Sequence, residues 1–315
     1  MKRRKNVFDF AVLLLSALIL VLGTACLVTA KDVFQPADDG KLRIIVFGAH
    51  PDDCELKAGG VAAMWSSQGH HVKFVSTTNG DIGHAEMAGG PLARRRTKEV
   101  QQAAKILGIE TEVLDNHDGE LIPTLENRKA FVRLIREWKA DVVIGHRPND
   151  YHPDHRYTGV LMQDAAFMVT VAFFCPDVRQ LPTNPVFLYL SDNFQKPNSF
   201  EPALVVDIDD VFEKKMDAIW MLESQIESLW ATSNFERIVP VPKEPAAHQE
   251  RKELVREQIS RGDEAIANKY RAKLIELYGQ EKAKKIQHAE AFELCEYGRQ
   301  PSAAELKKLF PFFGS

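Results

Sequence analysis

Two short segments of the chain place histidine and carboxylate side chains within a few positions of one another. The first is AHPDDCE, from Ala49 to Glu55. The second is HRPNDYHPDHR, from His146 to Arg156, and it contains HPDH at His152 to His155. Two imidazoles and one carboxylate can bind zinc and leave a fourth position for water, as in hydrolytic zinc sites. Structural zinc needs four ligands, commonly cysteines, and the four cysteines of this chain have no CxxC spacing. The residue types therefore predict a catalytic metal site.

Each segment directly follows a short apolar run that is expected to form a strand, at 42–47 and at 141–145. Further strands are expected at 71–77, 111–114, 187–190 and 203–206, alternating with helices at 55–68, 94–107, 127–138 and 210–229. This alternation predicts an α/β fold with a Rossmann-like, mostly parallel sheet and helices on both faces. Because ligands bind at the carboxyl ends of such strands, both segments should lie at the functional edge of the sheet.

A purely structural interpretation of the two segments is also open. Asp53 can cap the helix expected from Glu55, and Asp154 can cap the helix expected after His155. Cys54, within the first segment, is either a small buried residue that opens a helix or a soft metal ligand. Each segment alone fits a cap as well as a ligand. Their positions at corresponding ends of two parallel strands favour the metal site.

The two motifs resemble those of the PIG-L or LmbE-like family of de-N-acetylases, which act on N-acetylglucosaminyl conjugates. AHPDDCE matches the family's AHPDDxE form, HPDH matches its second motif, and the resemblance extends from about Ile44 to Thr158 and more weakly to about Ser228. It implies one zinc ion per chain, with Fe²⁺ as the alternative metal. The implied metal ligands are His50, Asp53 and His155.

The same resemblance assigns roles to the remaining site residues. It implies that Asp52 is the general base for the attack of metal-activated water on an acetamide carbonyl. It implies that His152, as a protonated donor, stabilises the oxyanion, and Asp154 then fits a carboxylate that tunes His152 or His155. Arg96, in the helix expected at 94–107, and Asp118 match family positions that contact the sugar. Two residues before His152, where some members have a tyrosine, this chain has Asp150.

The resemblance therefore implies a zinc-dependent hydrolase that removes the N-acetyl group from an N-acetylglucosamine-type sugar or glycoconjugate. Two alternatives stay open: another amide hydrolase on the same metal site, and a non-catalytic sugar-binding module. Asp52 argues against the module, because simple binding has no use for a base beside a metal-activated water. The expected partner is an N-acetylated amino sugar, and an oligomer is left open.

The charge of the chain is nearly balanced, with 40 Lys and Arg against 44 Asp and Glu and a net charge of -4. Such a balance does not favour nucleic acid as a partner. The basic residues at 2–5 precede an uncharged run at 10–30, which is typical of a signal peptide or an N-terminal membrane anchor. Val28-Thr29-Ala30 suits cleavage before Lys31, whereas lipidation at Cys26 would place Gly23 where an aliphatic residue is usual.

We therefore expect an exported protein, periplasmic, extracellular or anchored to the outer face of a membrane. Any contact with the membrane would be made only through residues 1–30, if they remain uncleaved. The expected domains are this leader at 1–30, a deacetylase domain at 31–240 and a helical C-terminal extension at 241–315. The segment VPVPKEP, from Val239 to Pro245, has the composition of a linker between the last two.

Overall fold

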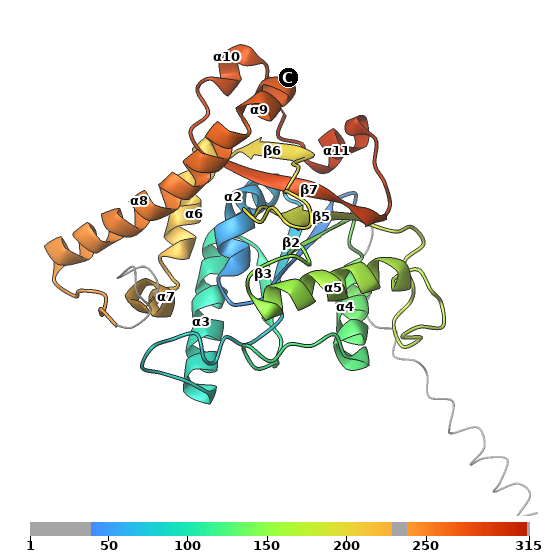
Figure 1. Cartoon of the computed structure of the whole chain (residues 1–315), viewed down its shortest axis with the longest axis horizontal. Coiled ribbons are helices and arrows are strands. Elements are labelled where there is room, and N and C mark those ends of the chain that lie inside the picture. Colours follow the sequence, from blue (N-terminus) through green and yellow to red (C-terminus); the bar gives the residue numbers. More distant parts are fainter. Residues whose placement is uncertain (1–38, 229–237, 314–315) are drawn as a thin grey trace, which may run out of the picture. The chain divides into compact units, whose positions relative to one another are not determined.

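The computed structural model describes residues 39–228 and 238–313, and these residues belong to one compact unit (Figure 1). The expected leader at residues 1–30 lies outside the described residues, so its cleavage or retention stays a prediction. Within the described ranges, none of the helices combines the length and the hydrophobicity that crossing a membrane requires.

A seven-stranded sheet forms the middle layer, with the order β3-β2-β1-β4-β5-β7-β6. Strands β1 to β5 pair in parallel, and β7 runs antiparallel to its neighbours β5 and β6. The predicted α/β fold with a mostly parallel sheet is therefore confirmed. The strands are β1 (Arg43–Gly48), β2 (His71–Ser76), β3 (Glu110–Val113), β4 (Val142–Gly145), β5 (Val186–Leu190), β6 (Leu204–Asp207) and β7 (Ala289–Gly298).

Helices cover both faces of the sheet because successive side chains of its buried strands point to opposite faces. In β1, Ile44 and Val46 belong to the core under α2, α3 and α6, whereas Ile45 and Phe47 belong to the core under α4 and α5 (Figure 1). The helices before residue 229 are α2 (Asp53–Ser67), α3 (Gly90–Leu107), α4 (Leu125–Trp138), α5 (Pro153–Met168), the 3₁₀ turn η1 (Asp209–Val211), α6 (Phe212–Ile219) and α7 (Glu223–Ser228). The single helix expected at 210–229 is thus divided into three pieces.

The C-terminal segment contains the expected helices but also contributes a strand to the sheet. Its helices are α8 (Pro245–Lys269), α9 (Arg271–Tyr278), α10 (Gln280–Ala283) and α11 (Ala303–Leu309). Strand β7 was missed because AEAFELCEYG is rich in residues that favour helices, and pairing with two neighbouring strands outweighs that preference. In this segment Leu274 is buried and Ile266 and Tyr270 pack against the same small core, whereas Leu254 is exposed.

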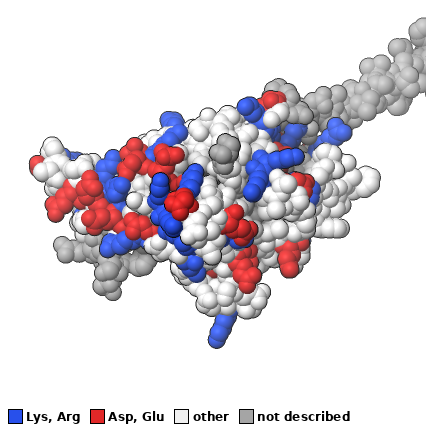
Figure 2. All heavy atoms as spheres, turned by 90° about the horizontal axis from the view of Figure 1, so that it is seen from above, with Lys and Arg blue, Asp and Glu red and all other residues white. Residues whose placement is uncertain are grey.

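The solvent-facing surface near α8 carries charges of both signs. Figure 2 shows acidic and basic side chains interspersed over the visible face, with many of them toward the side on which α8 lies in Figure 1. Mixed charges of this kind are typical of a solvated helix face.

The strand order reverses its direction between β1 and β4, because β1 leads through α2 to β2 on one side and β4 leads through α5 to β5 on the other. A reversal of this kind opens a crevice at the carboxyl ends of the two strands. At the end of β1, Gly48 allows the chain to turn closely past α2, since a β-carbon there would lie 2.8 Å from Cβ of Asp53. Both sequence motifs therefore meet at this crevice.

Candidate metal centre

The capping interpretation of the two motifs is wrong for both aspartates. Asp53 turns back toward its own loop, where its Oδ2 accepts hydrogen bonds from the backbone N–H of Ala49 at 2.9 Å and of His50 at 2.8 Å. The side chain that caps α5 is His152, not Asp154. The carboxylates are therefore available to the site rather than used at the ends of their helices.

Three side chains converge at the end of β1 and the start of α5. Nδ1 of His50 lies 3.2 Å from Nε2 of His155 and 3.5 Å from Oδ2 of Asp53, and Nε2 of His155 lies 3.5 Å from Oδ1 of Asp53. Ligand atoms about 2.1 Å from a tetrahedral metal lie roughly 3.4 Å from one another. The three side chains thus approach one another at the distances of metal ligands, with a different oxygen of Asp53 nearest each histidine, and the two nitrogens and one carboxylate suit a divalent ion.

Two carboxylates hold the far side of the His50 ring. Nε2 of His50 lies 3.1 Å from Oδ1 of Asp118 and 3.4 Å from Oδ2 of Asp154, although neither contact has the angles of a regular hydrogen bond. Burial alone would lower the pKa of His50, but Asp118, Asp154 and Asp53 raise it well above 6.5. A proton on Nε2 leaves Nδ1 free to bind a metal, as is usual when a carboxylate contacts a ligating histidine.

Asp154 faces His50, and its charge also acts to raise the pKa of His152, so the expectation that it tunes His152 or His155 stays a prediction. The carboxylate that contacts His155 is Asp150, whose Oδ1 lies 3.2 Å from Nδ1 of His155 and also accepts from the backbone N–H of His152 at 3.1 Å. Sequence reasoning gave Asp150 no role. Its position two residues before the second motif, on the same loop, was the available signal.

Asp52 and Arg96 form a buried ion pair beside the converging ligands, with Oδ1 of Asp52 3.3 Å from Nη2 of Arg96. Burial raises the pKa of Asp52 above 3.8, and Arg96 opposes this rise. The guanidinium also donates to the carbonyls of Gly80 at 3.1 Å and Pro51 at 3.3 Å, and its Nη1 lies 4.0 Å from Asp118. Arg96 therefore connects the expected base to the other predicted sugar-contacting residue, Asp118.

His152 is oriented by its own helix. Its Nδ1 accepts a hydrogen bond from the backbone N–H of Asp154 at 3.2 Å, so a neutral ring carries its proton on Nε2. Burial, together with the charges of His50 and His155, lowers the pKa of His152 below 6.5. The direction of this shift differs from the expectation of a protonated donor. A neutral ring with a proton on Nε2 can still donate one hydrogen bond.

A pocket of about 570 Å³ opens over these side chains. Asp154 is buried and does not line the pocket, whereas the lining residues Ile82 and Tyr151 have exposed side chains. Seven predicted site residues line the pocket: His50, Asp52, Asp53, Arg96, Asp118, His152 and His155. The structure therefore brings all of the sequence-predicted residues to one place.

His146 also belongs to this cluster, although the sequence analysis gave it no role. Its ring stacks on that of His155 at 4.1 Å between centroids, and its Nε2 lies 3.2 Å from Oδ2 of Asp53. Burial lowers its pKa, which favours the neutral ring. The signal for His146 was its place directly after β4. Cys54, by contrast, is buried with its Sγ 3.5 Å from the carbonyl of Val46, which fits a core residue rather than a ligand.

Comparison with known proteins gives the following similarities. The family model described as GlcNAc-PI de-N-acetylase matches residues 45–166. The diacetylchitobiose deacetylase of Thermococcus kodakarensis is 33% identical over 205 residues, which are 62% of this chain and 74% of that protein. The 4-oxalmesaconate hydratase of Pseudomonas putida is 26% identical over 194 residues, 59% of this chain and 74% of that protein.

The fold is also similar to that of a solved structure, the N,N'-diacetylchitobiose deacetylase of Pyrococcus horikoshii bound to an inhibitor. The TM-score is 0.62 at 23% sequence identity, and the match covers 84% of this chain and 87% of the other. At this identity the similarity supports the fold.

Proposed function

The chain belongs to the GlcNAc-PI de-N-acetylase family and acts as a hydrolytic N-deacetylase, and we propose that it is metal-dependent and removes the acetyl group from an N-acetylglucosamine-type sugar or glycoconjugate. One observation carries the proposal. His50, Asp53 and His155 converge at metal-ligand spacing, and the carboxylate of Asp52 lines the same pocket. A ligand set with a base beside it has the parts that hydrolysis of an amide needs.

We propose zinc as the metal, one ion per chain, with Fe²⁺ as the alternative. His50 and His155 would supply nitrogen ligands, and Asp53 would supply an oxygen ligand. Oδ2 of Asp53 already accepts two backbone hydrogen bonds, which leaves Oδ1 as the less committed ligand atom. When bound, the ion would activate water and polarise the acetamide carbonyl as a Lewis acid.

The surrounding residues supply the general base, the oxyanion donor and the contacts to the sugar. Asp52 takes the proton of the attacking water and returns it to the leaving amine, while Arg96 keeps the carboxylate in position. Nε2–H of His152 donates to the carbonyl oxygen as negative charge develops on it, a contribution of about 3 kcal/mol to lowering the barrier. Arg96 and Asp118, which both line the pocket, are proposed to contact the sugar as well.

The decisive experiment combines metal analysis of the purified chain with an acetate-release screen over N-acetylated sugars. We expect about one metal ion per chain and acetate release from at least one N-acetylglucosamine derivative. Acetate has to be the measured product, because one related protein is a hydratase. Metal-loaded protein that binds N-acetylated sugars but releases no acetate at any pH would support the binding-module alternative instead. Release of only longer acyl groups would support the other amide hydrolase.

We also propose that the enzyme is exported, so that its substrate is an external glycan or glycoconjugate. The basic residues at 2–5 and the uncharged run at 10–30 support this proposal. Expressed at full length in a bacterium, the protein should reach the far side of the inner membrane, with a mature N-terminus near Lys31. Recovery from the cytoplasm with residues 1–30 intact would contradict export.

A further inference from the structure

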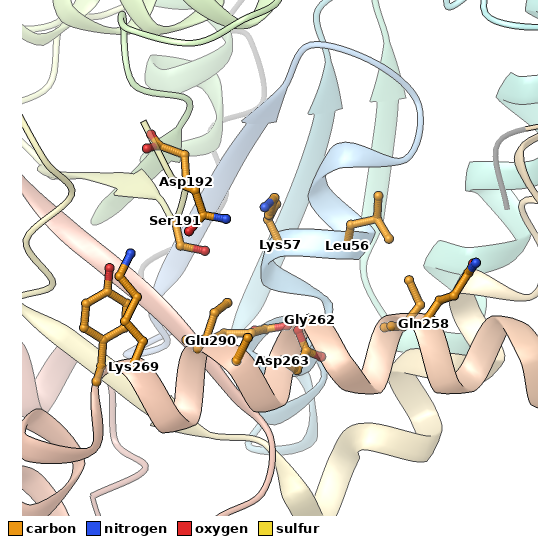
Figure 3. A pocket seen from close by; sticks show the side chains of 14 residues that line it. Leu56, Lys57, Ser191, Asp192, Gln258, Gly262, Asp263, Lys269 and Glu290 are labelled. Carbon is orange, nitrogen blue, oxygen red and sulfur yellow. The ribbon is translucent and has the colours of Figure 1, made fainter. Parts of the chain in front are cut away.

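A second cavity lies beside the metal pocket, between α2, α8 and the loop that follows β5. Its volume is about 360 Å³, which is within the range of small-ligand sites. Figure 3 shows Leu56 and Lys57 on α2 facing Gly262 and Asp263 on α8, with Ser191 from the loop at the side. Because β5 is parallel to β4 and β1, the loop after β5 leaves the sheet at the same edge as the metal ligands.

The second cavity adjoins the metal pocket. Leu56 and Lys57 line both cavities, and they lie in the first turns of α2, the helix that begins at the proposed ligand Asp53. The loop after β5 makes a second connection, because the ring of Phe194 lies 6.2 Å from the ring of Tyr151, which lines the metal pocket. A molecule extending from the metal pocket past Lys57 would therefore enter the second cavity.

The acidic side chains of the second cavity are already paired with buried cations. Asp263 and Glu290 lie 2.8 and 3.0 Å from Nζ of Lys215, and the Glu290 carboxylate also accepts from the backbone N–H of Gly60 and Val61. Asp192 is likewise paired with Nε of Arg147 at 2.8 Å. Each of these carboxylates thus already has a cationic partner within the protein.

Other polar groups of the cavity lack a protein partner. The hydroxyl of Tyr270 is buried without a hydrogen bond. Within the part of the chain that the structure describes, the side chains of Ser191, Gln258 and Lys57 form no hydrogen bond or ion pair either. They stand beside the apolar side chains of Leu56 and Ile259. Hydroxyl, amide and ammonium groups next to an apolar wall match the hydroxyls and the apolar face of a sugar ring.

We propose that the second cavity is a subsite for the neighbouring ring of an N-acetylated oligosaccharide whose reacting acetamide lies in the metal pocket. The proposal rests on the proposed function and extends it by naming the substrate class as an oligosaccharide of at least two rings. The shared side chains Leu56 and Lys57 then lie under the linkage between the two rings. Specificity for the longer substrate comes from α8, in the C-terminal part of the chain.

The test fills the cavity from α8. A β-carbon at Gly262 would meet nothing within 4 Å, and leucine favours helix, so Gly262→Leu should fold while occupying the subsite. The ratio of kcat/KM for diacetylchitobiose to kcat/KM for N-acetylglucosamine should fall about fivefold or more, through KM of the disaccharide. Arg261→Leu adds the same side chain at the neighbouring, exposed position and should leave the ratio unchanged. An unchanged ratio in Gly262→Leu would overturn the proposal.

A binding measurement separates this proposal from the proposed function. Calorimetry on full-length Asp52→Asn protein should show tighter binding of diacetylchitobiose than of N-acetylglucosamine, and adding Gly262→Leu should remove the difference. If the wild-type chain releases no acetate but this difference is seen, the proposed function fails and the subsite stands. Equal binding of the two sugars to Asp52→Asn protein would overturn the subsite even if acetate is released.

Discussion

The carboxylate of Asp154 faces His50, at 3.4 Å between Oδ2 and Nε2, although His152 and His155 are its neighbours in the sequence. The same carboxylate accepts hydrogen bonds from the backbone N–H of Gly119 at 2.6 Å and of Leu121 at 3.1 Å. A single buried side chain therefore joins the loops after β1, β3 and β4. From the first turn of α5, it fixes the ring of one proposed ligand that follows β1.

This relationship predicts that Asp154→Asn weakens metal binding without removing a ligand. The amide keeps the size of the side chain but loses the charge that orients His50, so metal affinity should fall about 10- to 100-fold. Competition with a chelator of known affinity measures the change. Asp164→Asn, on the same helix but away from the site, is the control. An unchanged metal affinity together with a lower melting temperature would mean that Asp154 only ties the loops together.

A pair of variants separates ligand from base. His155→Ala should lose stoichiometric metal and activity together, whereas Asp52→Asn should keep its metal and lose turnover by about 100-fold or more. Metal content and kcat are measured on the same preparations. One tightly bound ion remaining in His155→Ala would remove His155 from the ligand set. Equal loss of metal in Asp52→Asn would mean that Asp52 and Asp53 have exchanged roles.

His152 should affect the transition state more than the binding of substrate. Removing an oxyanion donor costs about 100- to 1,000-fold in kcat, so His152→Ala should show a loss of this size with metal bound and KM little changed. A loss that appears in KM while kcat is preserved would make His152 a sugar contact instead.

The lowered pKa of His152 also predicts how its donation of a hydrogen bond to the oxyanion depends on pH. The neutral form, which donates through Nε2, is populated above the lowered pKa and is lost only as the pH falls through it. The kcat profile of the wild-type enzyme should therefore show no alkaline decline caused by His152. An alkaline limb that disappears in His152→Ala would show that the protonated ring is the active form.

The sequence predicts the parts of this molecule that depend on local patterns. Apolar runs that end at AHPDDCE and at the segment starting with His146 locate β1 and β4, and the parallel arrangement then brings His50, Asp53 and His155 to one edge. The strand and helix boundaries around them agree with the structure within a few residues. These features need no knowledge of distant contacts.

The features that were missed all depend on contacts between distant segments. Strand β7 exists because β5 and β6 offer open edges, although its own composition favours helix. Asp154 faces His50 because the loop carrying Gly119 and Leu121 holds it there, and no pattern around residue 154 records that loop. His146 and Asp150 follow a predicted strand, but only the packed site shows that their side chains reach His155 and Asp53.

The buried lysine beneath the second cavity gives a prediction about stability. Lys215 is fully buried with its Nζ between Asp263 and Glu290, and these carboxylates raise its pKa although burial opposes the rise. Lys215→Met keeps the length of the side chain but leaves two buried carboxylates without their cation, which should cost about 3 to 5 kcal/mol in the free energy of unfolding. Urea denaturation followed by circular dichroism measures the change.

The neighbouring Lys214→Met is the control. It removes no ion pair among the described residues and should stay within about 0.5 kcal/mol of wild type. Asp263 and Glu290 also line the second cavity. A small effect of Lys215→Met on the free energy of unfolding would mean that the lysine charge interacts only weakly with the two carboxylates. The carboxylates would then be free to contact a ligand in the cavity.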